Sequence, residues 1–285
     1  MKKIIAFALA VVMLVGTMFT LTSCGSEYET NFGKDFVPVD SQMDVLLQLN
    51  AKSIDVGIMD SVMAGYYMSK DTTYANSLMI VPDLTLATEQ YGIAARKGSG
   101  LAKYISMALV ELAKDGTVDT IAEKYGLKSE ICIDKNYEAA EPTAAEMEDV
   151  RAIGERGKVV VGYTLFAPIA YKDDNGKLIG FDIELAEAVC AYLNIGVEFQ
   201  EINWSAKETL LASGSIDCIW NGMTITPERQ AAMEITIPYM NNKQVAVIRK
   251  EDQDLYKTTE DMKKALIGAE NGSAGMSCVV KDGEE

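Results

Sequence analysis

Apolar runs in this chain repeatedly end at the point where a helix begins. In residues 215–229 an apolar strand is predicted to end at Asn221, and a helix follows with Thr226 as its N-cap and Pro227 at its first position. Further helix starts are predicted at Ser41, at Asp182 as an N-cap and at a capping box in residues 205–208, and short strands at residues 78–81 and 91–96. The same succession of strand and helix occurs twice between residues 36 and 70. This succession predicts an α/β fold in which helices cover a parallel sheet.

Two segments of the chain echo each other. Residues 49–60 and residues 211–222 both run from a helix end through Ser-Ile-Asp into an apolar strand with a polar end. In this register Asp60 corresponds to Gly222. Because open α/β sheets bind ligands at the carboxyl ends of their strands, two similar lobes would place these strand ends across one cleft. The hydrophobic content of 48% over 285 residues is enough for two modest cores.

The first 24 residues have the pattern of a lipoprotein signal peptide. Lys2 and Lys3 precede an apolar run that reaches Phe19, and residues 21–24 read Leu-Thr-Ser-Cys. The alternative is a transmembrane anchor, but about 16 apolar or small residues are short for a membrane span. We therefore expect lipidation at Cys24 and a location on the extracellular face of the cytoplasmic membrane or in the periplasm.

Composition excludes several classes of function. The chain has 42 acidic and 26 basic side chains, a net charge of -16, so nucleic acid is not an expected partner. The sequence contains no histidine, which is the usual general base and zinc ligand. We therefore expect no metal site, no cofactor and no Ser-His or Cys-His catalytic pair. The cysteines at 132, 190, 218 and 278 have no CxxC spacing and are expected to be thiols rather than disulfides.

Arg229 is the first candidate for ligand binding. It falls in the first turn of the predicted helix, close to the N–H groups of Met223 and Thr224, which are freed where the strand ends. A guanidinium beside unpaired N–H groups suits a small carboxylate. The alternative is an exposed arginine in a surface ion pair. The glycine-rich turn at residues 271–275 is either a second anion site or an ordinary turn between strand and helix.

Several motifs together resemble the polar amino-acid solute-binding proteins of ABC importers. They lie at residues 180–186, Trp204, 214–217, 221–229, 238–239 and 272–275. The resemblance spans residues 150–285 and 30–127. It implies two Rossmann-like α/β lobes joined by two hinge strands, the type II periplasmic binding protein fold, which closes on one free amino acid.

The resemblance gives ligand-binding roles to four residues of lobe one. Arg229 resembles the arginine that binds the ligand carboxylate. Thr224 resembles the residue that holds the carboxylate through its N–H and the amino group through its hydroxyl. A neighbouring carbonyl, that of Asn221 or Gly222, can hold the amino group instead.

The resemblance also gives roles to lobe two and to two aromatic residues. Asp60 resembles the acid that pairs with the ligand α-ammonium, and Ser273 and Ala274 resemble backbone donors to the carboxylate. Phe166 and Trp204 resemble the aromatic residues that stack on the ligand side chain. The alternatives are that Asp60 only caps a helix and that the two aromatic residues belong to the core.

The order of the segments departs from the family. In the family the part that resembles residues 150–285 comes first and the part that resembles residues 30–127 comes second, whereas here the order is reversed. We interpret this as a circular permutation with the cut inside lobe two, because permutation is tolerated at exposed loops. The alternative is a fragment of a tandem array. Pairing of the two parts within one chain gives the expected monomer, and pairing between chains gives a swapped dimer.

Each predicted lobe is therefore built from two segments of the chain. Lobe two comprises residues 25–90 and 250–285, and lobe one comprises residues 91–127 and 150–249. Residues 128–149 are interpreted as a linker that joins the usual C- and N-termini of the family. Closure is expected at two hinge strands, near residues 91–96 and 244–249.

These features predict a lipid-anchored receptor that delivers a free amino acid to a membrane permease and performs no catalysis. An enzyme on this fold, such as a small-acid lyase or dehydratase, is one alternative and would depend on Asp and Glu as acids and bases. A sensor that presents its ligand to a signalling partner is another. Residues 163–171 contain no acid, which argues against lysine or arginine as the ligand. Phe166 and Trp204 permit apolar, polar or aromatic ligand side chains.

Overall fold

The computed structural model describes residues 28–70 and 72–281. The predicted signal peptide at residues 1–24 and the predicted lipidation at Cys24 lie outside the described residues. The strands are β1 (Asp35–Val39), β2 (Val56–Asp60), β3 (Leu78–Ala95), β4 (Lys158–Tyr163), β5 (Tyr171–Lys172), β6 (Leu178–Ile179), β7 (Gly196–Glu201), β8 (Cys218–Thr224), β9 (Glu234–Ile235), β10 (Met240–Arg249) and β11 (Leu266–Glu270). The α-helices are α1 (Gln42–Asn50), α2 (Ser61–Lys70), α3 (Thr72–Ser77), α4 (Leu101–Lys114), α5 (Thr117–Tyr125), α6 (Glu146–Arg156), α7 (Phe181–Tyr192), α8 (Lys207–Ala212), α9 (Pro227–Ala232) and α10 (Ala274–Val279). Short 3-10 helices occupy Lys128–Glu130, Trp204–Ala206, Lys250–Asp252 and Asp261–Lys264.

One mixed sheet runs through the whole described chain. Its strand order is β1-β11-β2-β10-β3-β8-β4-β7, with β9 also paired to β3. At one end β11 is parallel to β1 and β2, and at the other end β4 is parallel to β7 and β8. In the middle β10 is antiparallel to β2 and to β3, and β3 is antiparallel to β8. The two ends of the sheet therefore have the same local topology on either side of a central antiparallel pair.

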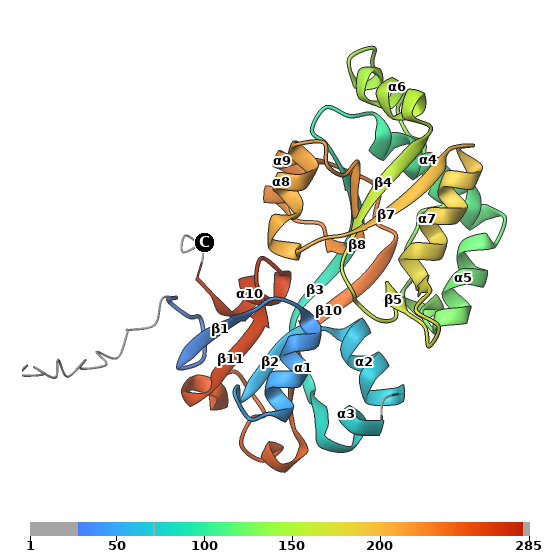
Figure 1. The fold of residues 1–285 in the computed structure, drawn as a ribbon. Helices are drawn as coiled ribbons and strands as arrows, with labels where there is room; N and C mark the ends of the chain where they lie inside the picture. Colours follow the sequence, from blue (N-terminus) through green and yellow to red (C-terminus); the bar gives the residue numbers. More distant parts are fainter. Residues whose placement is uncertain (1–27, 71, 282–285) are drawn as a thin grey trace, which may run out of the picture.

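The elements divide into two α/β lobes, which Figure 1 shows joined by β3 and β10. Lobe two holds β1, β2, β11, α1 to α3 and α10, and lobe one holds β4 to β9 and α4 to α9. The largest cluster of buried apolar side chains includes Leu46 and Met59 of lobe two and Leu109 and Leu185 of lobe one, with Tyr91 of β3 between them. The predicted fold class, two α/β lobes joined by two hinge strands, is confirmed.

The hinge strand β3 is longer than the sequence predicted. The strands expected at residues 78–81 and 91–96 are parts of one strand of 18 residues. Its pairing with β10 shifts between Ile80, which lies opposite Val247, and Thr85, which lies opposite Val245. Pro82 falls inside this irregularity, where the N–H that proline lacks is not needed for the ladder. Residues 82–90 are exposed or half-buried, so they lack the apolar alternation that identifies a strand.

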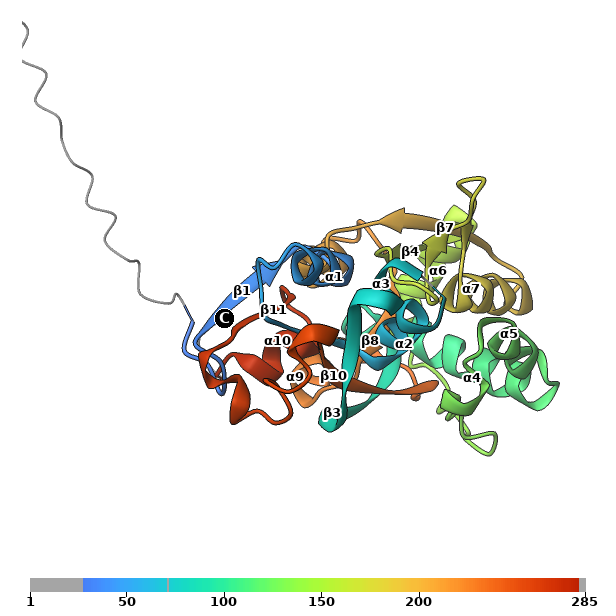
Figure 2. The same cartoon turned by 90° about the horizontal axis from the view of Figure 1, so that it is seen from below.

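The two ends of the described chain meet in lobe two. Strand β1 pairs along its whole length with β11, and the two lie side by side in both views (Figures 1 and 2). The N–H of Asn31 donates to the carbonyl of Val279 at 2.7 Å, and the N–H of Lys281 donates to the carbonyl of Glu29 at 2.9 Å. The two segments that make lobe two are thus paired within one chain.

The segment that the sequence identified as a linker ends in a helix that is packed on lobe one. Helix α6 begins at Glu146, inside the predicted linker, and its Asp149 accepts hydrogen bonds from Arg96 at 2.6 Å and from Ser99 at 2.5 Å. Lys103 of α4 also pairs with Glu146 at 2.8 Å. Side chains of β3 and α4 therefore fix this end of the segment.

Helix starts were predicted correctly in two places and incorrectly in two. Ser41 and Thr226 cap α1 and α9, as their positions indicated. Asp182, predicted as the N-cap of α7, lies within the helix, and the cap is Gly180 with a φ of 137°. The capping box predicted at residues 205–208 is also wrong, because Asn203 accepts from the N–H of Ser205 and a 3-10 turn precedes α8.

Candidate ligand-binding site

The candidate site lies where β2 and β8 end beside the two hinge strands. Asp60, the last residue of β2, is paired with Gln244 of β10, and Thr224, the last residue of β8, is paired with Tyr91 of β3. This arrangement agrees with the internal echo in the sequence, which aligned Asp60 with Gly222. Strand ends of this kind are where α/β folds bind ligands.

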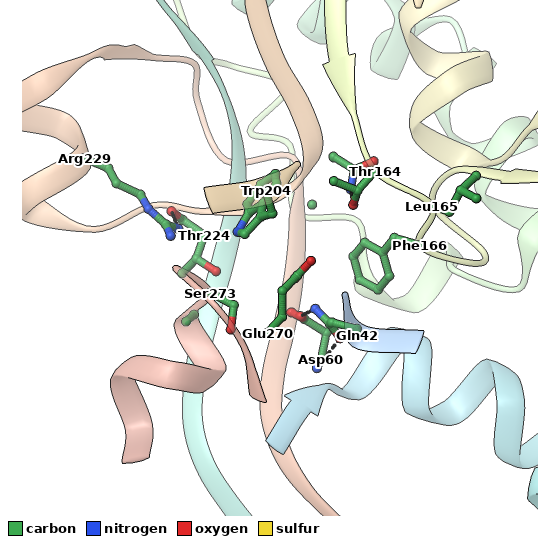
Figure 3. Close-up of a pocket in the computed structure, with 13 residues that line it drawn as sticks. Gln42, Asp60, Thr164, Leu165, Phe166, Trp204, Thr224, Arg229, Glu270 and Ser273 are labelled. Carbon is green, nitrogen blue, oxygen red and sulfur yellow. Dashed lines mark hydrogen bonds between the residues drawn. The ribbon is translucent and has the colours of Figure 1, made fainter. Parts of the chain in front are cut away.

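The nine residues predicted to bind a ligand all line one cavity between the lobes (Figure 3). They are Asp60, Phe166, Trp204, Asn221, Gly222, Thr224, Arg229, Ser273 and Ala274. Four further residues that the sequence did not single out complete the lining: Gln42, Thr164, Leu165 and Glu270. The structure brings the predicted residues together, and their roles in binding stay predictions.

Arg229 connects the two lobes. Its Nη1 donates to the carbonyl of Thr224 at 2.9 Å, and its Nη2 donates to the carbonyl of Gly272, in the turn before α10, at 3.2 Å. The hydroxyl of Thr226 accepts the N–H of Arg229 at 3.2 Å and fixes the first turn of α9. A guanidinium held by carbonyl oxygens keeps its positive charge, so an anion that enters the cavity meets a cation already in place.

A second cation, Lys207, lies beside Arg229 and was missed in the sequence. It is only 2% exposed, its Nζ donates to the same Gly272 carbonyl at 3.1 Å, and it lies 4.8 Å from the centre of the Trp204 ring. Burial, and then the charge of Arg229, lower the pKa of Lys207. Its position four residues before the buried Leu211 was the available signal, because both face the same side of α8.

Asp60 is held by side chains from three other elements. It is 5% exposed, and its Oδ1 accepts from the hydroxyl of Tyr91 at 2.5 Å, from Nε2 of Gln244 at 3.0 Å and from Nδ2 of Asn242. Its Oδ2 accepts from Nε2 of Gln42. Burial, and then the negative charge of Glu89, raise the pKa of Asp60 well above its usual value.

The alternative role of Asp60 as a simple helix cap does not fit these contacts. The N–H of Val62, in the first turn of α2, donates to Oδ1 of Asn242 at 3.3 Å. The hydroxyl of Ser61 donates to the same oxygen at 3.0 Å. Asn242 of β10 therefore binds the start of α2, and the carboxyl of Asp60 faces the hinge and the cavity.

Glu270, a buried acid at the end of β11, is the second residue that the sequence missed. It is 6% exposed and lies between Trp204 and Phe166 in Figure 3. Burial raises its pKa to about 8, and the nearby charge of Lys207 opposes this shift. Its signal in the sequence was its place directly before the glycine-rich turn, at the polar end of a predicted strand.

The wall of lobe one that faces the cavity is fitted closely around Gly222. This residue has a φ of 61°, and a Cβ added to it would lie 2.8 Å from the ring of Phe166 and 3.0 Å from that of Tyr91. Its N–H donates to Oδ2 of Asp182 at 2.8 Å, which also accepts from the hydroxyl of Tyr239 at 2.8 Å. Burial raises the pKa of Asp182 to about 7. Asp182, which is not the helix cap, thus supports Gly222 through its backbone N–H.

Asn221 and Ser273 differ in whether they offer a polar group without a hydrogen-bond partner. Asn221 donates its Nδ2 to the hydroxyl of Thr164 at 2.8 Å, while its Oδ1 is buried without a partner among the described residues. The N–H of Ser273, by contrast, already donates to the carbonyl of Glu270 at 3.2 Å. Asn221 can accept from a ligand as it stands, whereas the predicted role of Ser273 requires this turn bond to yield.

The cavity is narrow in this arrangement of the lobes. The space that its lining encloses is about 20 Å³, enough for about one water molecule. A free amino acid is several times larger than a water molecule. Such a ligand therefore does not fit into the cavity in this arrangement of the lobes.

Two kinds of feature are absent from the described residues, a metal-binding cluster and a membrane-spanning helix. Across residues 28–70 and 72–281, no three His, Cys, Asp or Glu side chains are grouped so that they could hold a metal ion. No helix in the same ranges is both long and apolar enough to cross a membrane. The four cysteines of this part of the chain are free thiols, and two of them, Cys190 and Cys218, are buried.

Comparisons with known proteins agree with the resemblance in the sequence. The family described as bacterial extracellular solute-binding proteins, family 3, matches residues 159–280. The L-cystine-binding protein TcyJ of Escherichia coli strain K12 is 29% identical over 122 residues, which cover 42% of this chain and 46% of that protein. The ABC transporter arginine-binding protein 1 of the same strain is 36% identical over 99 residues, which cover 35% of this chain and 40% of that protein.

Solved structures of amino-acid-binding proteins are similar as well. The arginine-bound form of domain 1 from TmArgBP is 30% identical and has a TM-score of 0.32, with 40% of this chain and 92% of that chain covered. The match to each of the two curated relatives spans less than half of the relative's length. Through residues 159–280 the chain is similar to the bacterial extracellular solute-binding proteins, family 3.

Proposed function

We propose that this protein binds one free amino acid between its two lobes and presents it to the permease of an ABC importer. The observation that carries the proposal is that a cation of lobe one, Arg229, and a carboxyl of lobe two, Asp60, line the same cavity. These are the charges that a zwitterion requires, a cation for its carboxylate and an acid for its ammonium. The relatives named above are amino-acid-binding proteins, which supports the same function.

Neutral groups in the cavity support the proposed orientation of the ligand. Asn221 has a buried acceptor oxygen with no partner within residues 28–70 and 72–281, and a ligand ammonium would satisfy it. The hydroxyl of Thr224 is already engaged, because it donates to Oε2 of Glu89 at 3.0 Å. In this proposal the N–H of Thr224 and the guanidinium of Arg229 bind the carboxylate, and Phe166 and Trp204 contact the side chain of the ligand.

Glu270 supports a ligand with a cationic or hydrogen-donating side chain. The absence of an acid from residues 163–171 argued against lysine and arginine, but Glu270 reaches the cavity from lobe two. A buried carboxyl with a raised pKa is stabilised when a cation or a donor reaches it. Relatives named as arginine-binding and L-cystine-binding proteins make these two amino acids the first to test.

The order of the chain belongs to the same proposal. A circular permutation, with its cut inside lobe two, accounts for a family match confined to residues 159–280. The pairing of β1 with β11 supports assembly of lobe two within one chain and therefore a monomer. Lipid anchoring at Cys24, on the outer face of the cytoplasmic membrane, is proposed from the sequence and from the extracellular description of the family.

A thermal-shift screen of residues 25–285 against L-cystine and the twenty standard amino acids tests the proposed function. A ligand present at about 100 times its dissociation constant stabilises the folded state by about 2.7 kcal/mol, which raises the melting temperature by several degrees. We expect one amino acid or a few related ones to do so. If none of them shifts the transition, the proposal is wrong. Conversion of a bound acid into a new product, followed by mass spectrometry, would favour a lyase or dehydratase instead.

A further inference from the structure

Glu89 is an acid of hinge strand β3 that none of the predicted roles includes. Its Oε1 accepts from Nδ2 of Asn242 at 2.5 Å and from Nε2 of Gln244 at 2.8 Å. The same two amide nitrogens donate to Oδ1 of Asp60. Because both carboxyl oxygens lie within hydrogen-bond length, about 3 Å, of the same nitrogens, the two carboxyl groups are near neighbours.

The groups that face this carboxyl pair are neutral. Four elements contribute them: Gln42 from α1, Tyr91 from β3, Thr224 from β8, and Asn242 and Gln244 from β10. From α10 the pair is faced by the Cys278 thiol, whose pKa is raised to about 11 by burial and then by the charges of Glu89 and Asp60. Within the described residues neither carboxyl forms a salt bridge, and the buried Lys207 pairs with Glu208 instead.

Two adjacent carboxyl groups without a cation cannot both ionise at low cost. Each charge raises the free energy of the other, and the pair then binds one proton at a pH where separate acids would bind none. The strong upward shift of the Asp60 pKa, caused by burial and then by Glu89, agrees with this arrangement. Asp60 lines the cavity, and the hydroxyl of Thr224 connects Glu89 to the other wall.

Buried acceptors around the site indicate what would take the place of that proton. Oδ1 of Asn221 and Oε1 of Gln244 are buried and have no partner among the described residues. Asn221 is 3% exposed and lines the cavity, and Gln244 is 1% exposed and contacts both carboxyl groups. These two acceptors lack donors, and a cationic donor such as an ammonium can supply one.

We propose that Glu89 is a positioning residue of the ligand site, and that it shares one proton with Asp60 which the ligand ammonium displaces. Before binding, the pair carries one proton and one negative charge. After binding, the ammonium keeps its own protons, both carboxyl groups are ionised, and one proton passes to the solvent. This proposal rests on the proposed function, because it requires an amino acid whose ammonium reaches Asp60.

Calorimetric titration with L-arginine and with L-glutamine tests the proposal. At pH 7 the α-ammonium groups of both probes are fully protonated, so a proton that is released comes from the protein. The observed enthalpy in phosphate and in Tris, plotted against the ionisation enthalpy of the buffer, gives the number of protons released. We expect about one proton to be released for each bound ligand. At pH values below the raised pKa of Asp60, the affinity should increase as the pH rises, by up to about tenfold for each pH unit.

Two variants separate a shared proton from a purely structural role of Glu89. In Glu89→Gln the release should fall to a small fraction of a proton and the affinity should become nearly independent of pH, with binding retained. Glu138→Gln, at an exposed position, is the matched control and should release as many protons as the wild type. Binding of either probe without proton release, or the same release in Glu89→Gln, would overturn the inference and leave the proposed function standing.

A measurement without ligand completes the test. An acid whose pKa is raised on folding makes the folded state less stable as the pH rises through that pKa. The melting temperature of Glu89→Gln relative to the wild type should therefore increase between pH 5 and pH 8, because Asp60 then loses its charged neighbour. A difference in melting temperature between the variant and the wild type that does not change with pH would contradict the shared proton. This result does not depend on a ligand, whereas failure of every amino acid to bind would separately reject the proposed function.

Discussion

Arg229 donates to the carbonyl of Thr224 within its own lobe, so its guanidinium is in place before a ligand arrives. In Arg229→Ala the ligand carboxylate would be enclosed without its cation, and we expect amino-acid binding to weaken by about 2 to 4 kcal/mol. Titration calorimetry with the amino acid identified by the thermal-shift screen measures the change. Arg151→Ala, at an exposed position of α6, is the control and should leave the dissociation constant unchanged. An equal affinity in the two variants would reject the role of Arg229.

Because Glu270 is buried, we expect the stability of the folded protein to depend on pH. Its pKa in the folded protein is about 8, against 4.5 in an unperturbed glutamate, so the folded state binds this proton more tightly than the unfolded state. The stability that Glu270 contributes is thus greatest below pH 4.5 and is lost as the pH rises towards 8. Glu270→Gln should be more stable than the wild type at pH 8.5, by about 1 to 3 kcal/mol, and equally stable near pH 4. Urea denaturation at the two pH values checks this, and an equal difference at both would contradict it.

At the scale of elements, α6 is the part whose position the sequence predicted least well. Its burial is slight, with Ile153 as its buried residue, and its position depends on Arg96, Ser99 and Lys103 of other elements. Periodicity cannot identify a helix that polar tertiary contacts hold. Asp149→Ala should cost about 1 to 2 kcal/mol and release α6. Hydrogen exchange in residues 146–156 should then become faster while that of β4 stays slow, and unchanged exchange would mean that these contacts do not hold the helix.

The sequence predicted some element boundaries correctly and others incorrectly, even where a cap or an apolar run marked them. Ser41 and Thr226 led to correct helix starts because capping depends on local chemistry, whereas β8 continues to Thr224, beyond its predicted end at Asn221, because residues 223 and 224 still pair with β3. The exposed middle of β3 could not be predicted, since its pairing with β10 comes from the geometry of the hinge. Lys207 and Glu270 had only weak local signals in the sequence, and Glu89 had none. Their importance depends on burial and on partners from distant segments, which one sequence does not show.

At the scale of the whole molecule, the two ends of the described chain meet, so we expect its segments to fold when they are joined in the opposite order. Because Thr30 and Val280 form a β-bridge, a short linker can join the two ends of the described chain. A rearranged protein with residues 139–281, a glycine-serine linker and then residues 28–138 would have the segment order of the family and would keep α6 and its contacts. We expect it to bind the same amino acid within about tenfold of the original affinity, because the contacts are retained. Loss of folding or of binding in this protein would argue against a circular permutation.

The central claim about the whole molecule is that a single chain builds a complete amino-acid site from its two ends. Native mass spectrometry of residues 25–285 with the amino acid identified by the thermal-shift screen tests this most directly, because it reports mass and ligand together. We expect the main species to be one chain that carries one amino acid. Amino acid found only on dimers or longer assemblies would mean that the halves of the site pair between chains, and a monomer without bound amino acid would contradict the account.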